Sequence, residues 1–324
     1  MKIFFIDRDS CKLADSESFV LNSIKKDLLS FSTFEQTILP EQADVFLIQE
    51  HNSLKDFRYI NEILNDPFLG KYFNKTFTIN IDDCATGILR DLYTSLRKSR
   101  FNPDIYGAVP FLMYPNELVF SQKPTAIIPN YLAGWRGNTT SNKIRALIIE
   151  SLSDKPDIHF GKTMSWLNHD EKEKQVYIDL IENSKFSLCP AGLAPVTFRI
   201  FESMALGRCP IIISDEFVLP LGPKWENFAL FFPENDINGL YPFLLKNEPR
   251  YRELGERAHE AWQSFFGPRV IQKYYAELLF KLITFRSQPS KKEELKRWSS
   301  FKLHWSNGWT MPQRILNKIS FALR

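Results

Sequence analysis

The stretch from residue 183 to residue 235 reads NSKFSLCPAGLAPVTFRIFESMALGRCPIIISDEFVLPLGPKWENFALFFPEN. Its first apolar run, Lys185–Cys189, predicts a buried strand that ends in a loop of small residues. Apolar side chains then recur at helical spacing over Val196–Leu206, and Gly207 ends that pattern. A second apolar run, Cys209–Ser214, predicts another buried strand. Strand, helix and strand in this order are typical of a parallel βαβ unit.

The same alternation extends over most of the 324 residues. Further strands are predicted at Lys2–Ile6, Asp44–Ile48, Thr76–Ile81, Gly107–Met113, Ala126–Pro129, Asp157–Phe160 and Ala229–Phe232. Further helices are predicted at Ser16–Leu29, Ser141–Ser151, Glu171–Asn183 and Asn235–Leu245. The alternation predicts an α/β protein whose parallel sheets carry helices on both faces, and the length fits two domains.

A polar turn before residue 125 marks the predicted domain boundary. Beyond it the pattern restarts with the strand Ala126–Pro129 and a glycine-containing turn over residues 133–140. After Pro249 the chain is predicted to be helical to about Phe285. We therefore expect an N-terminal Rossmann-like domain over 1–125, a second one over 126–285, and a basic aromatic tail over 286–324.

The predicted helix Val196–Leu206 carries the residues best suited to binding a ligand. In open parallel sheets, ligands bind at the carboxyl ends of the strands, where helix N-termini attract phosphates. Arg199 and Glu202 are three residues apart and share one face of this helix. A guanidinium there can neutralise a diphosphate, and a carboxylate can accept hydrogen bonds from ribose hydroxyls.

An ordered set of motifs in this region resembles the exostosin family, glycosyltransferase family 47. The motifs are Phe186-Ser187-Leu188-Cys189-Pro190-Ala191-Gly192, Phe198-Arg199-Ile200-Phe201-Glu202-Ser203, Gly207-Arg208-Cys209-Pro210-Ile211-Ile212-Ile213-Ser214-Asp215, Leu219-Pro220 and Trp225. The resemblance covers roughly 126–265. It implies a GT-B fold, in which two Rossmann-like domains face each other across a cleft and C-terminal helices close the chain. It also implies inverting transfer of a sugar from a nucleotide donor, typically UDP-linked, to a glycan hydroxyl.

The resemblance also implies which residues bind the donor. The expected nucleotide-sugar ligands are Arg136, Asn138, Thr197, Arg199, Glu202 and Asp215. The chain departs from the family's pattern at Ala191, where the family often has an arginine, and at Ser203, where it usually has an alanine. The first departure removes a phosphate ligand and leaves more of the charge neutralisation to Arg199 and Arg136. Trp225 is expected to pack in the core rather than stack on a sugar.

The general base of an inverting reaction must be a carboxylate or an imidazole at the edge of the first domain. Asp83, Asp82, Glu50 and His51 all follow predicted strands, and Asp83 and Asp82 are our candidates. Asp7-Arg8-Asp9 spells a metal-binding DxD pattern, but it follows the very first strand. We therefore expect no metal and no cofactor, since protein groups and helix dipoles neutralise the leaving diphosphate in GT-B enzymes.

Charge is unevenly distributed along the chain. Residues 286–324 hold nine Lys/Arg and two Glu, a net charge of +7, whereas the remaining residues carry −4. A mildly acidic body argues against a nucleic-acid partner. Aromatic and basic residues over 291–324 suit peripheral contact with a membrane, and the alternative is that this tail packs on the N-terminal domain. Without a predicted leader or membrane span, we expect a cytoplasmic protein, peripheral at the membrane if the tail binds it.

These observations predict an inverting glycosyltransferase of polysaccharide biosynthesis that uses a nucleotide sugar, UDP-linked by resemblance, and a glycan or lipid-linked glycan acceptor. Three alternatives stay open. The chain could be a fucosyl-type transferase with a GDP-sugar donor, a sugar-nucleotide epimerase of similar fold, or a catalytically inactive subunit that binds a sugar nucleotide. The missing arginine at Ala191 is the feature that keeps the inactive subunit open.

Overall fold

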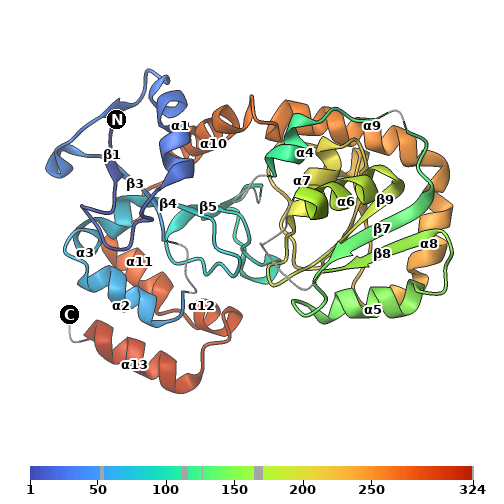
Figure 1. Ribbon diagram of the computed structural model, residues 1–324. Coiled ribbons are helices and arrows are strands. Elements are labelled where there is room, and N and C mark those ends of the chain that lie inside the picture. The colour runs from blue at the N-terminus through green and yellow to red at the C-terminus, as the bar shows by residue number, and fades with distance from the viewer. Residues whose placement is uncertain (52–54, 111–115, 126, 164–170, 323–324) are drawn as a thin grey trace. The chain divides into compact units, whose positions relative to one another are not determined.

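The computed structural model describes residues 1–324 except 52–54, 111–115, 126, 164–170 and 323–324 (Figure 1). The chain divides into two compact units, each with its own parallel sheet. The first unit comprises residues 1–109 and 272–324, and the second comprises residues 110–271.

The first unit is built on a six-stranded sheet. In sheet order its strands are β2 (Glu35–Gln36), β1 (Lys2–Ile6), β3 (Val45–Gln49), β4 (Thr76–Asn80), β5 (Arg90–Tyr93) and β6 (Tyr106–Ala108). All neighbours pair in parallel. Every residue of β3 and β4 is buried, as expected of central strands covered by helices on both faces.

The helices of the first unit come from both ends of the chain. They are α1 (Phe19–Leu29), α2 (Arg58–Asn65), α3 (Leu69–Tyr72), α10 (Ile271–Phe285), α11 (Lys291–Trp298), α12 (Phe301–Ser306) and α13 (Met311–Ala322), with 3₁₀ turns η1 (Pro40–Gln42), η2 (Phe73–Lys75) and η3 (Lys98–Arg100). One core cluster joins α2 to α11 through Ile60, Ile63 and Trp298. Phe280 of α10 stacks on Phe31 just past α1, with ring centroids 4.5 Å apart.

The second unit is built on a five-stranded parallel sheet. In sheet order its strands are β11 (Leu230–Phe231), β10 (Cys209–Ile213), β9 (Ser184–Pro190), β7 (Tyr131–Gly137) and β8 (Ile158–Lys162). Its helices are α4 (Glu117–Ser121), α5 (Lys143–Leu152), α6 (Glu171–Glu182), α7 (Phe198–Ala205), α8 (Leu240–Asn247) and α9 (Tyr251–Ala261), with short turns η4 (Trp225–Asn227), η5 (Ile237–Gly239), η6 (Glu248–Arg250) and η7 (Trp262–Phe266).

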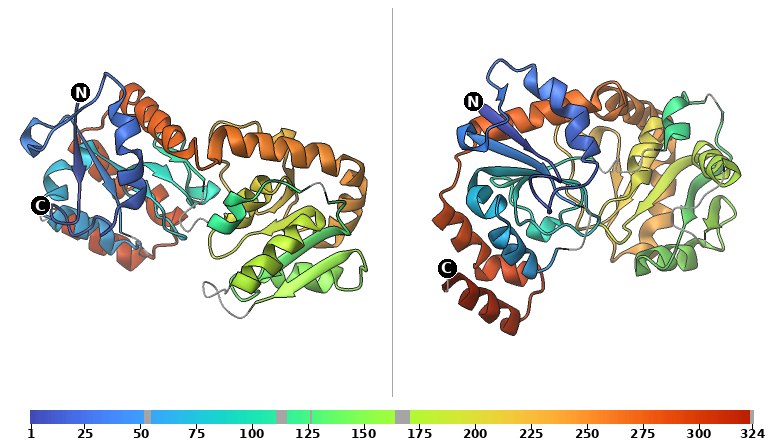
Figure 2. Two further views of the ribbon diagram at one scale, coloured as in Figure 1. Left: turned by 45° about the horizontal axis from the view of Figure 1, so that its top comes forward. Right: turned by 60° about the vertical axis from the view of Figure 1, so that its left-hand side comes forward.

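Helices cover both faces of the second sheet, as Figure 2 shows. Trp135 of β7 packs into the cluster that holds Ile144 and Ile148 of α5. Leu180 of α6 packs closely against β7 at Gly134, because a Cβ added to this glycine would lie 2.8 Å from the side chain of Leu180. Trp225 is 3% exposed and its indole donates to the Pro220 carbonyl at 2.9 Å, which confirms its predicted role in packing.

The α/β class and the two units with parallel sheets are confirmed. The facing of the units across a cleft stays a prediction. Most predicted strands match within two residues, but the strand expected at Ala126–Pro129 is wrong: residues 127–129 are irregular and residue 126 lies outside the described residues. The strand is β7, over residues 131–137, which includes part of the expected turn. Part of the expected strand Gly107–Met113 also lies outside the described residues.

The two units differ from the expected domain boundaries. Residues 110–125 belong to the second unit, where the ring of Phe120 in α4 lies 4.7 Å from that of Trp262. Residues 272–324, including the expected tail, belong to the first unit. The physical reason is burial, because Trp298 is fully buried in the core of that unit.

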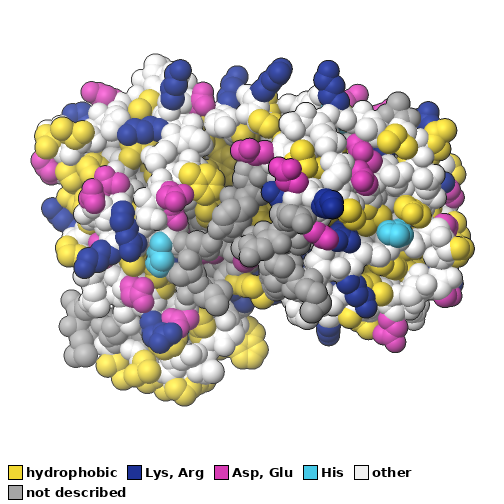
Figure 3. Space-filling model, in the orientation of Figure 1, with side chains coloured by type: hydrophobic (Ala, Val, Ile, Leu, Met, Phe, Trp, Pro, Cys, Tyr) yellow, Lys and Arg dark blue, Asp and Glu magenta, His cyan; other side chains and the backbone are white. Residues whose placement is uncertain are grey.

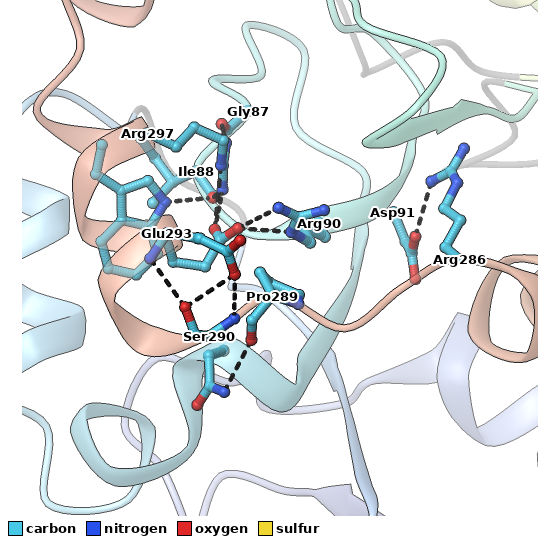
Figure 4. Close-up of polar contacts among 12 residues, drawn as sticks. Gly87, Ile88, Arg90, Asp91, Arg286, Pro289, Ser290, Glu293 and Arg297 are labelled. Carbon is cyan, nitrogen blue, oxygen red and sulfur yellow. Dashed lines mark hydrogen bonds and ion pairs between the residues drawn. The ribbon is translucent and has the colours of Figure 1, made fainter.

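A strap formed by residues 286–298 fastens the C-terminal segment to strand β5 (Figure 4). Arg286 pairs with the fully buried Asp91 at 3.1 Å. Glu294 pairs with Arg90, and the Trp298 indole donates to the Ile88 carbonyl at 2.9 Å. The side chains of Ser290 and Glu293 form a capping box, so α11 begins at Lys291. These buried ion pairs and hydrogen bonds hold α11 against the sheet.

Candidate functional site

The strand order of the second sheet singles out one edge for ligand binding. From β7 the chain adds β8 on one side and then β9 on the other, so the topology switches direction between β7 and β9. Ligands of open parallel sheets bind beside the carboxyl ends of strands at such a switch point. We call the residues that follow β7 and β9, together with the first turn of α5 and the first two turns of α7, the donor edge.

Arg199 lies in the first turn of α7 at the donor edge and is 7% exposed. Its guanidinium lies over two rings, 5.5 Å from the centroid of Trp135 and 4.9 Å from that of Tyr177. One terminal nitrogen donates to the Arg136 carbonyl, and the buried Nε has no hydrogen-bond partner among the described residues. Aromatic faces and a carbonyl fix the group in position, and no carboxylate among the described residues forms an ion pair with it.

Arg145, from the first turn of α5, is a second guanidinium at the donor edge that sequence reasoning did not select. Its Nε donates to the Ala191 carbonyl at 3.0 Å, and its Nη1 donates to the Asn138 carbonyl at 2.9 Å. Burial and the nearby charge of Arg199 lower the pKa of Arg145 to about 10. Arg145 therefore bridges the loops after β7 and β9, directly beside the position where the family's arginine is replaced by Ala191.

Glu202 follows Arg199 on the same face of α7 and is 8% exposed. The Tyr177 hydroxyl donates to its Oε2 atom. Burial raises the pKa of the Glu202 carboxyl, while Tyr177 and the Arg199 charge act in the opposite direction. The predicted pair is thus brought together with Tyr177, a residue of α6 that the sequence did not indicate.

The other expected donor ligands have local partners. Arg136 pairs with Glu173 of α6, which balances its charge. The Asn138 side chain accepts from the Thr140 amide at 2.7 Å and so builds the turn after β7. Asp215 and Glu234 each accept from the other's backbone amide, at the ends of β10 and β11.

Thr197 is the N-cap residue of α7, and its side chain makes no capping hydrogen bond within the described part of the chain. Roles for Arg136, Asn138, Asp215 and Thr197 in binding stay predictions.

The corresponding edge of the first sheet carries buried carboxylates. Glu50 follows β3 and is 1% exposed, and its Oε2 accepts from Thr78 at 2.7 Å and from Asn80 at 3.1 Å. Asp82 follows β4 and forms a buried ion pair with Lys55. Burial raises the pKa of Asp82 and the Lys55 ammonium opposes that shift. We call these residues, together with Asp83, the carboxylate edge.

The two candidate bases differ in their surroundings. Asp82 is 2% exposed and held by Lys55 and Asn80. Asp83 is only partly buried, and no partner for its carboxylate is found among the described residues. Burial alone raises the pKa of Asp83 above its ordinary value of 3.8. Asp83 is therefore the more accessible and the less constrained of the two.

The remaining candidates of the first unit serve local structure. The His51 ring lies 3.2 Å from the Leu13 carbonyl. The Asp7 side chain accepts from both the amide and the hydroxyl of Ser10, which builds the turn after β1. Across the part of the chain that the structure describes, no group of three or more His, Cys, Asp and Glu side chains is arranged to hold a metal ion.

Parts of this chain resemble known proteins. Residues 87–247 match the Exostosin GT47 domain. An exostosin-1 homolog from Caenorhabditis elegans is 29% identical over 120 residues, which is 36% of this chain and 31% of that protein. The probable glucuronosyltransferase GUT1 from Oryza sativa subsp. japonica is 38% identical over 72 residues, 22% of this chain and 17% of that protein.

Among solved structures, MurG from Acinetobacter baumannii aligns with a TM-score of 0.37 at 10% identity, over 86% of this chain and 99% of that one. The chain spans less than a third of the length of the two relatives named above. The matched region nevertheless contains the whole donor edge, with Arg145, Arg199 and Glu202. Residues 87–247 of this chain therefore resemble the Exostosin GT47 domain of glycosyltransferases.

Proposed function

We propose that this protein transfers a sugar, with inversion, from a UDP-linked donor to a hydroxyl of a glycan or lipid-linked glycan during polysaccharide biosynthesis. One observation carries the proposal: two guanidinium groups without ion-pair partners among the described residues lie at the switch point of a GT47 domain. Paired positive charge at that edge suits a nucleoside diphosphate. A cytoplasmic location is part of the same proposal.

The residues of the donor edge bind different parts of the donor. Arg199 and Arg145 neutralise the diphosphate, and the N-terminal dipole of α7 adds to their effect. Because Arg199 is held between two rings, little reorganisation is needed when charge develops on the leaving group. Glu202, held by Tyr177, accepts hydrogen bonds from the ribose.

Asp83 supplies the base in this proposal. Its carboxylate accepts the proton of the acceptor hydroxyl while that oxygen forms a bond to the anomeric carbon. The bond from the anomeric carbon to the diphosphate oxygen breaks, and the nucleoside diphosphate leaves with the electron pair. The raised pKa of Asp83 supports this role, since a base works best when its pKa is nearer to the working pH.

A thermal-shift screen of the intact protein with UDP, GDP and other nucleoside diphosphates tests the donor class. Ligand at 100 times its Kd stabilises a protein by about 2.7 kcal/mol. Stabilisation by UDP, followed by hydrolysis of one UDP-sugar in a donor panel, supports the proposal. Stabilisation by GDP alone would indicate the fucosyl-type alternative. UDP binding without turnover of any donor and acceptor would indicate an inactive subunit, and a rearranged free nucleotide sugar would indicate an epimerase.

A further inference from the structure

The segment 291–324 combines two structural roles that the sequence offers only as alternatives. Its first part, α11, belongs to the strap, where the buried Glu294 pairs with Arg90 of β5 and the buried Trp298 donates to the Ile88 carbonyl. Its second part, α12 and α13, follows this anchored helix and projects apolar side chains to the surface. The strap therefore fixes the position of a segment whose outer side is not used by the core of the first unit.

Exposed hydrophobic side chains gather on α12 and α13. Trp305 is 73% exposed and stacks on Phe301, which is 55% exposed, with ring centroids 5.6 Å apart. The exposed aliphatic residues of α13 are Met311, Ile315, Leu316 and Ile319, each more than half exposed. Figure 3 shows hydrophobic side chains along the lower edge of the molecule, where Figure 1 places α13.

The exposed apolar residues of α13 are spaced so that they lie on one side of the helix. Met311, Ile315 and Ile319 are four residues apart, so they lie on one side of the helix, and Leu316 lies next to Ile315. Contiguous exposed apolar area of this kind marks a contact with another molecule or with a membrane. We call Phe301, Trp305, Met311, Ile315, Leu316 and Ile319 the apolar face.

The charge around the apolar face selects the partner. From Leu295 to Arg324 the sequence holds six Lys/Arg and no Asp or Glu. Lys296 and Lys302, within α11 and α12, are exposed. Aromatic and aliphatic side chains among cations suit the boundary between anionic headgroups and acyl chains, where indole rings are favourable. An acidic protein partner would complement the cations but would not account for six exposed large apolar side chains.

We propose that α12 and α13 dock on the surface of an anionic membrane through the apolar face, with the strap holding them to the first unit. The apolar face inserts among the headgroups, and the exposed Lys296 and Lys302 contact the lipid phosphates. This docking goes beyond the donor chemistry and uses none of the residues of the donor edge or the carboxylate edge. Its failure would leave the proposed transfer reaction intact.

Co-sedimentation of the full chain with vesicles tests the docking. We expect binding to vesicles of phosphatidylglycerol and phosphatidylcholine at low salt, weaker binding as salt rises, and little binding to phosphatidylcholine alone. The variant Trp305→Ser/Ile315→Ser/Ile319→Ser is expected to lose at least tenfold in vesicle binding, with unchanged melting temperature and donor hydrolysis. Ile38→Ser is the matched control, because Ile38 is 80% exposed in the first unit but far along the chain from this face.

Three results would overturn the proposal. Absence of vesicle binding by the intact protein at low salt would be one, and equal binding by the triple variant would be another. The third is a dimer of the intact protein that the triple variant abolishes without any effect of lipid, which would assign the face to a second copy of the chain. Sedimentation velocity of both proteins without vesicles measures that outcome directly.

Discussion

The carboxyl-end edges of the two sheets follow the same topological rule and carry opposite charge. The donor edge of the second unit presents Arg145 and Arg199 against rings and carbonyl oxygens. The carboxylate edge of the first unit presents Glu50, Asp82 and Asp83, with Lys55 as the balancing cation of Asp82. One edge is suited to hold an anion and the other to accept a proton, which matches the roles that we propose for Arg199 and Asp83.

Removing the base is expected to have the largest effect on activity. Asp83→Asn keeps the shape of the side chain but cannot accept the acceptor proton, and general-base catalysis contributes about 10²–10⁴-fold. We expect kcat to fall by that factor while the melting temperature and donor affinity stay unchanged. Steady-state kinetics with a matched acceptor measure it.

Asp82→Asn is the control for this prediction. It removes the carboxylate that balances the buried Lys55 ammonium, and breaking such a buried ion pair costs about 3–5 kcal/mol in the free energy of unfolding. Denaturant titration should therefore show a large decrease in the free energy of unfolding for Asp82→Asn and almost no decrease for Asp83→Asn. Full activity in a folded Asp83→Asn protein would remove Asp83 from the mechanism.

Substitution of Glu202 at the donor edge is expected to lower donor affinity and to leave the proton transfer unaffected. Glu202→Gln loses charge-assisted hydrogen bonds to the ribose, worth roughly 1.5–3 kcal/mol, or about tenfold or more in donor affinity. Calorimetric titration with UDP measures the change, and Glu226→Gln, an exposed carboxylate of the same unit, is the matched control. Unchanged UDP affinity and donor KM would contradict the ribose role of Glu202.

The pH dependence of turnover separates the two edges. A base is active when deprotonated, so kcat/KM should fall as pH decreases through the pKa of Asp83, by about tenfold per pH unit below it. Because burial raises that pKa, the acid limb should begin above the ordinary carboxyl value of 3.8. Because burial also raises the pKa of Glu202 at the donor edge, UDP affinity should fall at acid pH as well. The variant Asp83→Asn separates the two groups: it should remove the Asp83 limb of kcat/KM and leave the pH dependence of UDP affinity unchanged, and loss of the pH dependence of UDP affinity in this variant would contradict the assignment.

Arg145 should have a smaller effect than Glu202. Arg145→Lys keeps the charge but loses the planar fork that bonds both the Ala191 and the Asn138 carbonyls, so the two loops are held less firmly while the cation remains. We expect UDP affinity to fall by several-fold, with larger loss in Arg145→Met. Equal UDP affinity in the wild-type protein and Arg145→Met would leave Arg145 with a structural role alone.

The smallest effect is expected from chelation. If the arginines of the donor edge neutralise the diphosphate, EDTA should leave donor turnover unchanged. The measurement is an initial rate with and without EDTA, and with added Mg²⁺ or Mn²⁺. Loss of turnover that either ion restores would replace this assignment by a metal-dependent one.

Sequence pattern predicted most of the fold because central strands of parallel sheets are continuous apolar runs. The pattern did not predict strands whose polar side chains pair with residues far away in the sequence. Strand β5 begins with Arg90 and Asp91, which look like surface residues until Arg286 and Glu294 are found bonded to them. Strand β7 contains two glycines in a short run, a pattern that is typical of a turn. Gly134 is there for a packing reason instead, since a Cβ at this position would lie 2.3 Å from Ser184 Oγ.

The donor edge was partly predictable for the same reason. Arg199 and Glu202 share one helix face, so spacing alone brings them together. Arg145 and Tyr177 belong to α5 and α6, and their approach to α7 depends on how those helices pack on the two faces of the sheet. A cation in the first turn of the helix that follows the switch-point strand was the available signal for Arg145.

The strap has a consequence for the order in which the protein is made. Unit one consists of residues 1–109 and 272–324, and its contacts between Arg90 and Glu294 span 204 residues. During synthesis, the second unit emerges whole and can fold as one continuous stretch, whereas the first unit must wait for residues 286–298 before β5 gains its buried partners. Until then Asp91 lacks its ion-pair partner Arg286, and the core of the first unit lacks Trp298. The nascent first unit is thus an incomplete sheet for most of translation, and completion of the strap is a late step in its folding.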